Sequence, residues 1–222
     1  MNTTTISSAR AGSGTVRTVL GIFKLRIGVL IMISALAGLA ITPGPTIGIV
    51  QGLVLALSVL VASASAGAFN QYIEADSDRL MARTRRRAFA SGALSTSPLW
   101  LVLIALLLAA AVGASALVVN PVAAGFLCLG AFTYGVVYTL WLKRRTWANI
   151  VIGGLSGSFA VLAGAAAVDP TLGALLGGAY FLRKTHALAR APSRATAMAS
   201  FFASMVQLSA LLAAVAVDAA IR

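Results

Sequence analysis

The stretch IGIVQGLVLALSVLVASASAGAFNQYIEADSD, residues 47–78, decides how this chain folds. Residues 47–72 carry no charged side chain, and they exceed the roughly 20 apolar residues that a helix needs to cross a bilayer. Three carboxylates then follow within five residues, at Glu74, Asp76 and Asp78. The stretch therefore predicts a transmembrane helix that ends in an acidic segment at the membrane surface.

The composition of the whole chain agrees with a membrane protein. Of its 222 residues, 59% are hydrophobic and only 10% are charged, whereas a soluble domain carries about 25% charged residues. Lys and Arg number 17 against 5 Asp and Glu, but in so apolar a chain this surplus indicates membrane topology, and no nucleic-acid partner is expected. A single cysteine excludes a disulfide scaffold, and a single histidine, His186, excludes a site built on two imidazoles.

Further apolar runs predict the fold class, an all-α polytopic transmembrane helical bundle of about seven helices. Runs long enough to span lie at 18–41, 47–72, 99–118, 121–142, 148–168 and 196–221. A shorter run at 171–182 is counted as a seventh crossing, because without it the basic loop after it would lie on the wrong side. We read residues 1–17 as a polar cytoplasmic tail and 18–222 as one transmembrane domain.

The basic residues predict the orientation of the bundle. All but Arg222 of the 17 lie in residues 1–26 or in the loops 73–98, 143–147 and 183–195. Alternate breaks, such as Asn120-Pro121, contain no Lys or Arg. By the positive-inside rule the N-terminus and all basic loops face the cytoplasm, in a multi-pass protein of the cytoplasmic (inner) membrane. A cleaved signal peptide is the competing interpretation of the start.

The acidic segment predicts the site. Asn70, Glu74 and Asp78 are four residues apart, so on a continuing helix they share one side, with Asp76 on the other. Oxygen ligands of this kind hold Mg²⁺, and the arginines that follow from Arg79 to Arg87 suit phosphate oxygens. A prenyl diphosphate presents such a group at a membrane surface. The alternative is a solvated loop whose carboxylates neutralise topogenic arginines.

Three stretches carry a resemblance to a known family. AFNQYIEADSDRLMART, residues 68–84, resembles the first aspartate motif, N-x-x-x-D-x-D-x-D-x-x-M-x-R-T, of UbiA-type membrane prenyltransferases of the branch that farnesylates protohaem IX. FKLRIG, residues 23–28, resembles the K-P-R-I start of its first helix. YTLWLKRRTWANIVIGG, residues 138–154, resembles its Y-T-x-x-L-K-R-x-T-x-x-N-I-V-I-G-G segment.

The chain also departs from that family. Members have nine transmembrane helices, and this chain has room for about seven. The missing pair falls after Val168, and with it go the family's second polar cluster and a histidine expected near the haem. Glu74 replaces the usual Asp and keeps its charge, and Leu25 stands where proline is usual.

The resemblance implies an enzyme that transfers a farnesyl group from farnesyl diphosphate to a vinyl group of haem B, with Mg²⁺, in haem O and haem A biosynthesis. Its partners would be these two substrates, the lipid bilayer and other haem-biosynthesis membrane proteins. The implied catalytic and metal-binding residues are Asn70, Glu74 and Asp78. The implied residues for diphosphate or propionates are Lys24, Arg26, Arg83, Lys143 and Arg144, and Tyr138 would line the cavity of the reacting cation.

Two alternatives stay open beside this hypothesis. One is another UbiA-type enzyme that prenylates an aromatic acceptor such as a quinone precursor. The other is a shortened, non-catalytic membrane protein that binds haem or a partner, and the missing helices are its main support.

Overall fold

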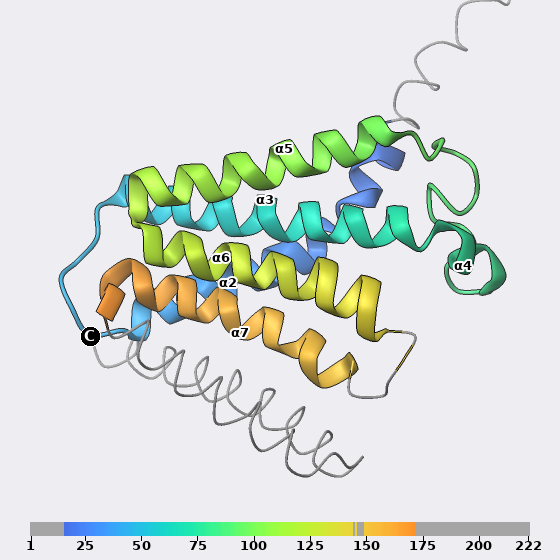
Figure 1. Ribbon diagram of the computed structural model, residues 1–222. Helices are drawn as coiled ribbons and strands as arrows, with labels where there is room; N and C mark the ends of the chain where they lie inside the picture. Colours follow the sequence, from blue (N-terminus) through green and yellow to red (C-terminus); the bar gives the residue numbers. More distant parts are fainter. Residues whose placement is uncertain (1–15, 144, 146–148, 172–222) are drawn as a thin grey trace, which may run out of the picture.

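The computed structural model describes residues 16–143, 145 and 149–171, and within them every regular element is a helix. The helices are Val16–Ile22, α2 (Leu25–Ile41), α3 (Ile49–Ile73), α4 (Ala75–Leu80), α5 (Pro98–Ala114), α6 (Pro121–Phe132) and α7 (Asn149–Val168). Two π-helical segments, η1 (Ser115–Val119) and η2 (Thr133–Leu142), continue α5 and α6. The long helices lie side by side, with short α4 at one end of the bundle (Figure 1). The predicted all-α class is confirmed.

The membrane spans lie close to where the apolar runs predict them. Within the described residues, three helical stretches are long and apolar enough to cross a membrane: Ile49–Ile73, Pro98–Val119 and Pro121–Leu142. A fourth is added if Val16–Ile22 and α2, which meet at a bend of 48°, count as one span. The chain is therefore a multi-pass membrane protein. Residues 1–15 of the predicted tail 1–17, residues 172–182 of the run 171–182, the run 196–221 and His186 lie outside the described residues.

Local sequence explains where two of the spans begin. The Ser97 side chain accepts a hydrogen bond from the Leu99 amide, and Pro98 occupies the first turn of α5. Asn120 does the same for α6 by accepting from the Ala123 amide at 2.8 Å, and Pro121 follows it. The side-chain Nδ2 of Asn120 also donates to the Ala166 carbonyl at 2.8 Å, so this one residue both caps α6 and links it to α7.

Close helix packing depends on small residues. α7 packs against α2 and α6, while α3 packs against α2 and α5. At the α2–α7 contact, a Cβ on Gly38 would overlap the Val161 backbone, and one on Gly164 would overlap the Ala35 carbonyl. Only glycine lets these two backbones approach so closely, which is the usual way that helices associate in lipid.

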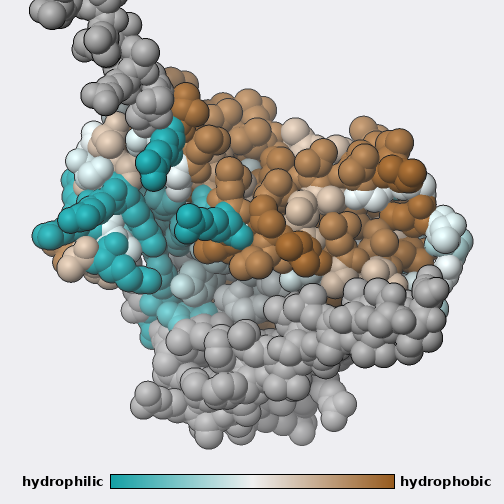
Figure 2. Space-filling view, turned by 180° about the vertical axis from the view of Figure 1, so that it is seen from behind, coloured by the Kyte–Doolittle hydropathy of each residue, from teal (hydrophilic) through white to brown (hydrophobic). Residues whose placement is uncertain are grey.

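An aromatic cluster anchors the connection between α4 and α5 at one end of the bundle. Phe89 is buried and makes edge-to-face contacts with Tyr72 of α3 and Trp100 of α5, at centroid distances of 5.5 and 5.7 Å. Hydrophilic residues gather at one end of the molecule, and hydrophobic residues cover much of the remaining described surface (Figure 2). The connection is therefore held in place at the polar end, where its arginines can meet the end of α3.

Candidate active site

Asn70, Glu74 and Asp78, which we call the acidic stripe, lie on one side as predicted, although the helix is interrupted at Glu74. α3 ends at Ile73, and Glu74 sits at the junction to α4 with φ −90° and ψ 4°. The Glu74 amide still bonds the Asn70 carbonyl at 3.1 Å, and the Asp78 amide bonds the Glu74 carbonyl at 2.8 Å. Asn70, Glu74 and Asp78 are consequently 2%, 5% and 2% exposed, whereas the Asp76 side chain is 94% exposed.

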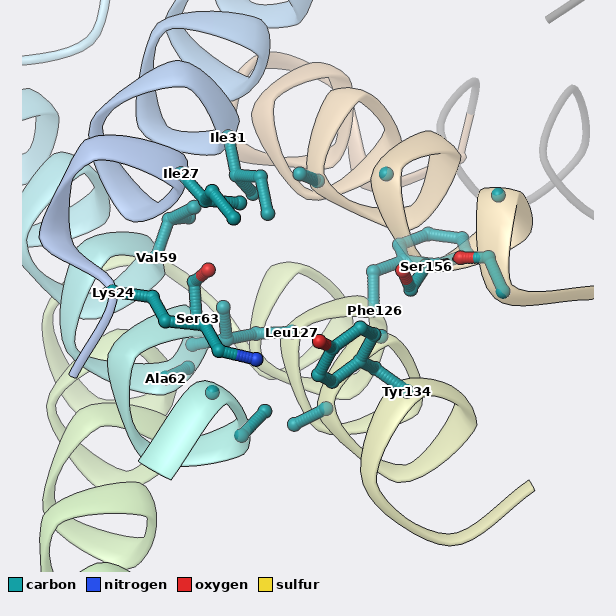
Figure 3. A pocket seen from close by; sticks show the side chains of 18 residues that line it. Lys24, Ile27, Ile31, Val59, Ala62, Ser63, Phe126, Leu127, Tyr134 and Ser156 are labelled. Carbon is teal, nitrogen blue, oxygen red and sulfur yellow. Dashed lines mark hydrogen bonds between the residues drawn. The ribbon is translucent and has the colours of Figure 1, made fainter. Parts of the chain in front are cut away.

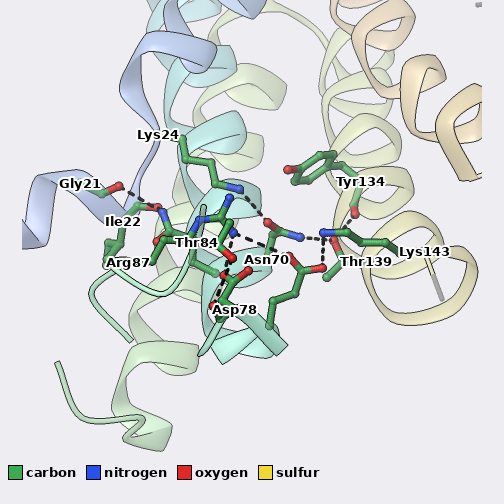
Figure 4. A network of polar contacts seen from close by, with 12 residues as sticks. Gly21, Ile22, Lys24, Asn70, Asp78, Thr84, Arg87, Tyr134, Thr139 and Lys143 are labelled. Carbon is green, nitrogen blue, oxygen red and sulfur yellow. Dashed lines mark hydrogen bonds and ion pairs between the residues drawn. The ribbon is translucent and has the colours of Figure 1, made fainter. Parts of the chain in front are cut away.

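Two basic side chains pair with the buried carboxylates (Figure 4). Lys143, just after η2, donates to Glu74 Oε1. Arg87 Nη1 donates to Asp78 Oδ2 at 2.7 Å and lies 3.9 Å from Glu74 Oε2. Glu74 Oε2 is buried and has no hydrogen-bond partner among the described residues. The site thus holds one carboxylate oxygen that is ready to accept a further ligand.

Asn70 joins this pair of carboxylates to the first span. Its Oδ1 accepts from Lys24 Nζ at 2.7 Å, and its Nδ2 donates to Thr139 Oγ1 at 3.2 Å. Thr139 in turn donates to the Tyr134 carbonyl at 2.8 Å. Lys24 is the one non-glycine residue of the described chain with a left-handed backbone, at φ 47°, and it occupies the bend before α2.

An apolar cavity of about 300 Å³ adjoins this network (Figure 3). Lys24 and Tyr134 lie at its polar part, and the Lys24 amine points toward the Tyr134 hydroxyl. Its apolar walls come from α2, α3, α6 and α7 and include Ile27, Ile31, Val59, Phe126, Leu127 and Ala160. Glycines and alanines of the same helices and two serines, Ser63 and Ser156, complete the lining, which leaves room for a hydrophobic chain between the spans.

The structure brings most of the predicted site residues together. Lys24, Asn70, Glu74, Asp78 and Lys143 form one polar network. Tyr138 adjoins it, because Lys143 Nζ lies 5.6 Å from the centre of its ring. Two predicted residues, Arg26 and Arg83, are exposed and take no part in the network within the described part of the chain. Arg144 lies outside the described residues.

The sequence pattern does not identify three residues that take part in the polar network: Arg87, Thr139 and Tyr134. Arg87 closes the arginine run and directly precedes the buried residues Ala88 and Phe89, which was the available signal for its inward position. Tyr134 stacks on Tyr138 at 5.4 Å between centroids, and their four-residue spacing was the signal for a shared face.

The donor set fits a magnesium ion that is shared with a substrate. Within the described residues no group of three or more His, Cys, Asp and Glu side chains could hold a metal. Mg²⁺, however, is commonly bound through one or two carboxylates together with substrate phosphates. Glu74 and Asp78 supply two carboxylates on one side, and the unpartnered Glu74 Oε2 is the atom best placed to ligate. The residues present therefore fit a Mg²⁺–phosphate pair and do not form a complete all-protein site.

Comparisons with known proteins point to one group. The sequence model described as the UbiA prenyltransferase family matches residues 31–217. Protoheme IX farnesyltransferase 2 of Paramagnetospirillum magneticum is 39% identical over 273 residues, covering 89% of this chain and 95% of that protein. Because this alignment is longer than the 222-residue chain, part of the relative has no counterpart here.

Other relatives are matched over a smaller part of their length. Protoheme IX farnesyltransferase 1 of the same organism is 43% identical over 157 residues, which cover 71% of this chain and 55% of that protein. Protoheme IX farnesyltransferase of Anaplasma marginale is 40% identical over 154 residues, covering 68% and 50%. The chain thus spans about half the length of these two relatives. No solved structure matches this chain.

Proposed function

Because the chain belongs to the UbiA prenyltransferase family, we propose that it transfers a farnesyl group from farnesyl diphosphate to a vinyl group of protohaem IX (haem B). The relatives named above are farnesyltransferases of protoheme IX. The observation that carries the proposal is the position of Lys24, which belongs both to the charged network and to the apolar cavity. A prenyl diphosphate has the same two parts, a charged head and a hydrophobic tail.

The polar network would bind the diphosphate. Lys24, Lys143 and Arg87 surround the two carboxylates, so the site has one positive charge more than it neutralises internally. These side chains favour the charge that develops on the diphosphate as the allylic C–O bond breaks and its electron pair leaves with oxygen. Mg²⁺ held by Asn70, Glu74 and Asp78, when bound, would act as a Lewis acid toward the same phosphate oxygens.

The apolar cavity would protect the allylic cation. Its walls exclude water while the vinyl π-electrons form the new C–C bond, and the Tyr134 and Tyr138 rings stand near its polar part. Water then adds to the cation left on the acceptor and releases a proton, which gives a hydroxyethylfarnesyl group. Early entry of water would instead yield farnesol, so a dry cavity determines which product forms.

The proposal includes a place in the cell. The polar end of the bundle would face the cytoplasm, with the N-terminus on the same side of the inner membrane, because the basic residues gather there. The product would serve haem O and haem A biosynthesis, and other membrane proteins of that sequence of reactions would supply haem or take up the product.

One observation favours a second candidate function. The alignment to the relative from Paramagnetospirillum is longer than this chain, so a segment of that relative is missing here. A chain that lacks a substrate-contacting segment could keep haem binding and lose turnover. The second candidate is therefore a non-catalytic haem-binding membrane protein. Among the described residues of the site, none favours an aromatic or quinone acceptor over haem.

The reaction can be tested with a pair of acidic variants. Membranes containing the full chain receive haem B, farnesyl diphosphate and Mg²⁺, and mass spectrometry of extracted haem detects haem O. We expect Glu74→Gln to lower the rate about 100-fold, because it removes the charge from a buried ligand. EDTA should have a similar effect on the wild type.

Asp76→Asn is the matched control. It removes the same charge two residues away, but from a side chain that is exposed and pairs with Arg79 at 3.5 Å. It should retain the wild-type rate. Equal activity of Glu74→Gln and wild type would contradict the assigned site, and absence of haem O from inserted wild-type protein would favour the haem-binding candidate.

A further inference from the structure

A second cavity, of about 530 Å³, lies at the polar end between the helix Val16–Ile22 and the connection that joins α4 to α5. Four cationic side chains line it: Arg17, Lys24, Arg86 and Arg87. None of the described residues of its lining is acidic. We call it the basic cavity, and neither the family comparison nor the proposed chemistry of the carboxylates accounts for it.

The basic cavity adjoins the polar network on a different side from the apolar cavity. Lys24 and Ile27 line both cavities. Arg87 belongs to the basic cavity and also bonds Asp78, while Lys24 bonds Asn70. Figure 4 shows the Lys24 and Arg87 side chains on the same side of the network. Two cavities of opposite character thus meet at the charged site, as a reaction of two substrates requires.

The described lining of the basic cavity lacks the carboxylate ligands that a magnesium-bound diphosphate needs, so it suits an anion that binds without a metal. A guanidinium pairs bidentately with carboxylates as well as with phosphates, and a carboxylate requires no metal beside it. Mg²⁺ needs protein oxygen ligands beside the phosphates, and those lie at Glu74 and Asp78, outside this lining. Arg17 and Arg86 are exposed and form no ion pair with a described residue, so both can pair with a ligand.

We propose that the basic cavity binds the carboxylates of the acceptor, the two propionates of haem, while the apolar cavity takes the prenyl tail. The inference rests on the proposed function and adds the place of the acceptor. Propionates and vinyl groups lie on different edges of the macrocycle. Propionates held by Arg17 and Arg86 therefore leave the vinyl edge free to point toward Lys24 and Ile27, where the two cavities meet.

Binding of haem to the full chain in nanodiscs, followed by the Soret band, tests this without turnover. Haem B is compared with its dimethyl ester, which lacks both negative charges. We expect the wild type to bind haem B about 10-fold more tightly than the ester. The double variant Arg17→Ala/Arg86→Ala should lose this preference while keeping its affinity for the ester.

Arg85→Ala is the matched control, because Arg85 is an exposed arginine next to Arg86 that does not line the cavity. It should keep the 10-fold preference. An unchanged preference in the double variant would overturn the proposal, and so would equal loss in Arg85→Ala, which would indicate a general charge effect.

Inorganic pyrophosphate without metal distinguishes the two possible sources of the anion. Its binding to the wild type and to the double variant is measured directly: if the double variant loses pyrophosphate binding but keeps the preference for haem B over the ester, the cavity takes the donor's diphosphate and the proposal fails. Loss of the preference for haem B in the double variant with unchanged pyrophosphate binding supports the acceptor's carboxylates. Failure of farnesyl transfer is a separate result: loss of ester discrimination in the double variant supports the acceptor site even where no haem O forms.

Discussion

At the scale of single residues, the site pairs cations and carboxylates before any substrate arrives. Arg87 and Lys143 each donate a hydrogen bond to a buried carboxylate, and Lys24 donates to the side-chain carbonyl of Asn70. A buried carboxylate without a partner is costly, so these pairs stabilise the acidic stripe inside the bundle. An incoming diphosphate would offer the same cations a second partner, and the stripe would then be free to share Mg²⁺ with it.

Arg87 is predicted to contribute to folding as well as to the site. Arg87→Gln removes the partner of Asp78, which is 2% exposed, and should destabilise the fold by about 1–3 kcal/mol. Thermal unfolding of the purified chain in detergent would show a lower Tm. Addition of Asp78→Asn to Arg87→Gln should restore part of the loss, because the uncompensated charge disappears.

Arg83→Gln provides the comparison for that variant. Arg83 is exposed and takes no part in the network among the described residues, so its loss should leave the free energy of unfolding within about 0.5 kcal/mol of the wild type and Tm nearly unchanged. Equal shifts for Arg83→Gln and Arg87→Gln would mean that the Asp78 pair contributes nothing specific.

The residues of the stripe could be predicted from sequence, but their partners could be predicted only in part. Four-residue spacing placed Asn70, Glu74 and Asp78 together because helical periodicity survives the junction at Glu74. The choice of Arg87 among five nearby arginines depends on Phe89, whose burial against two aromatic rings fixes the connection. The apolar pair Ala88-Phe89 after Arg87 is a local signal, but it does not say which distant rings receive Phe89, and the resemblance indicates Arg83, which is exposed.

At the scale of helices, the ends of the membrane spans could be predicted from the sequence, but the bend before α2 could not. Uninterrupted apolar runs and the Asn120-Pro121 cap located the spans to within a few residues. The bend of 48° at Lys24 has no proline or glycine at its centre. It is maintained by contacts from α3: Asn70 binds the Lys24 ammonium, and Gln71 Nε2 donates to the carbonyls of Gly21 and Ile22.

The α2–α7 contact gives a prediction at this scale. Gly164→Ala places a methyl group onto the Ala35 carbonyl, and the two helices must separate. We expect a loss of about 1–3 kcal/mol, measured as a lower Tm in detergent. Gly113→Ala on α5 is the control, because a Cβ there meets nothing within 4 Å and alanine favours the helix. A stable Gly164→Ala would contradict the close packing of α2 on α7.

At the scale of the whole molecule, charged residues lie at one end of the bundle and hydrophobic residues cover the surface along its length. Exposed Leu, Ile and Val side chains line α2, α3 and α5, as lipid contact requires, and basic side chains gather beyond the ends of α3 and η2. Both cavities reach Lys24, near this basic end. Orientation in the membrane therefore decides from which side both substrates are reached.

Cysteine labelling in whole cells tests that orientation. In a Cys128→Ser background, cysteine replaces the exposed Thr46, in the loop between α2 and α3, or the exposed Arg85, in the connection at the polar end. The positive-inside rule predicts that a membrane-impermeant maleimide labels Thr46→Cys in intact cells and Arg85→Cys only after the membrane is opened. The reverse pattern would place the basic end outside the cytoplasm. Both substrates would then have to be reached from that face, and the proposed place in the cell would be wrong.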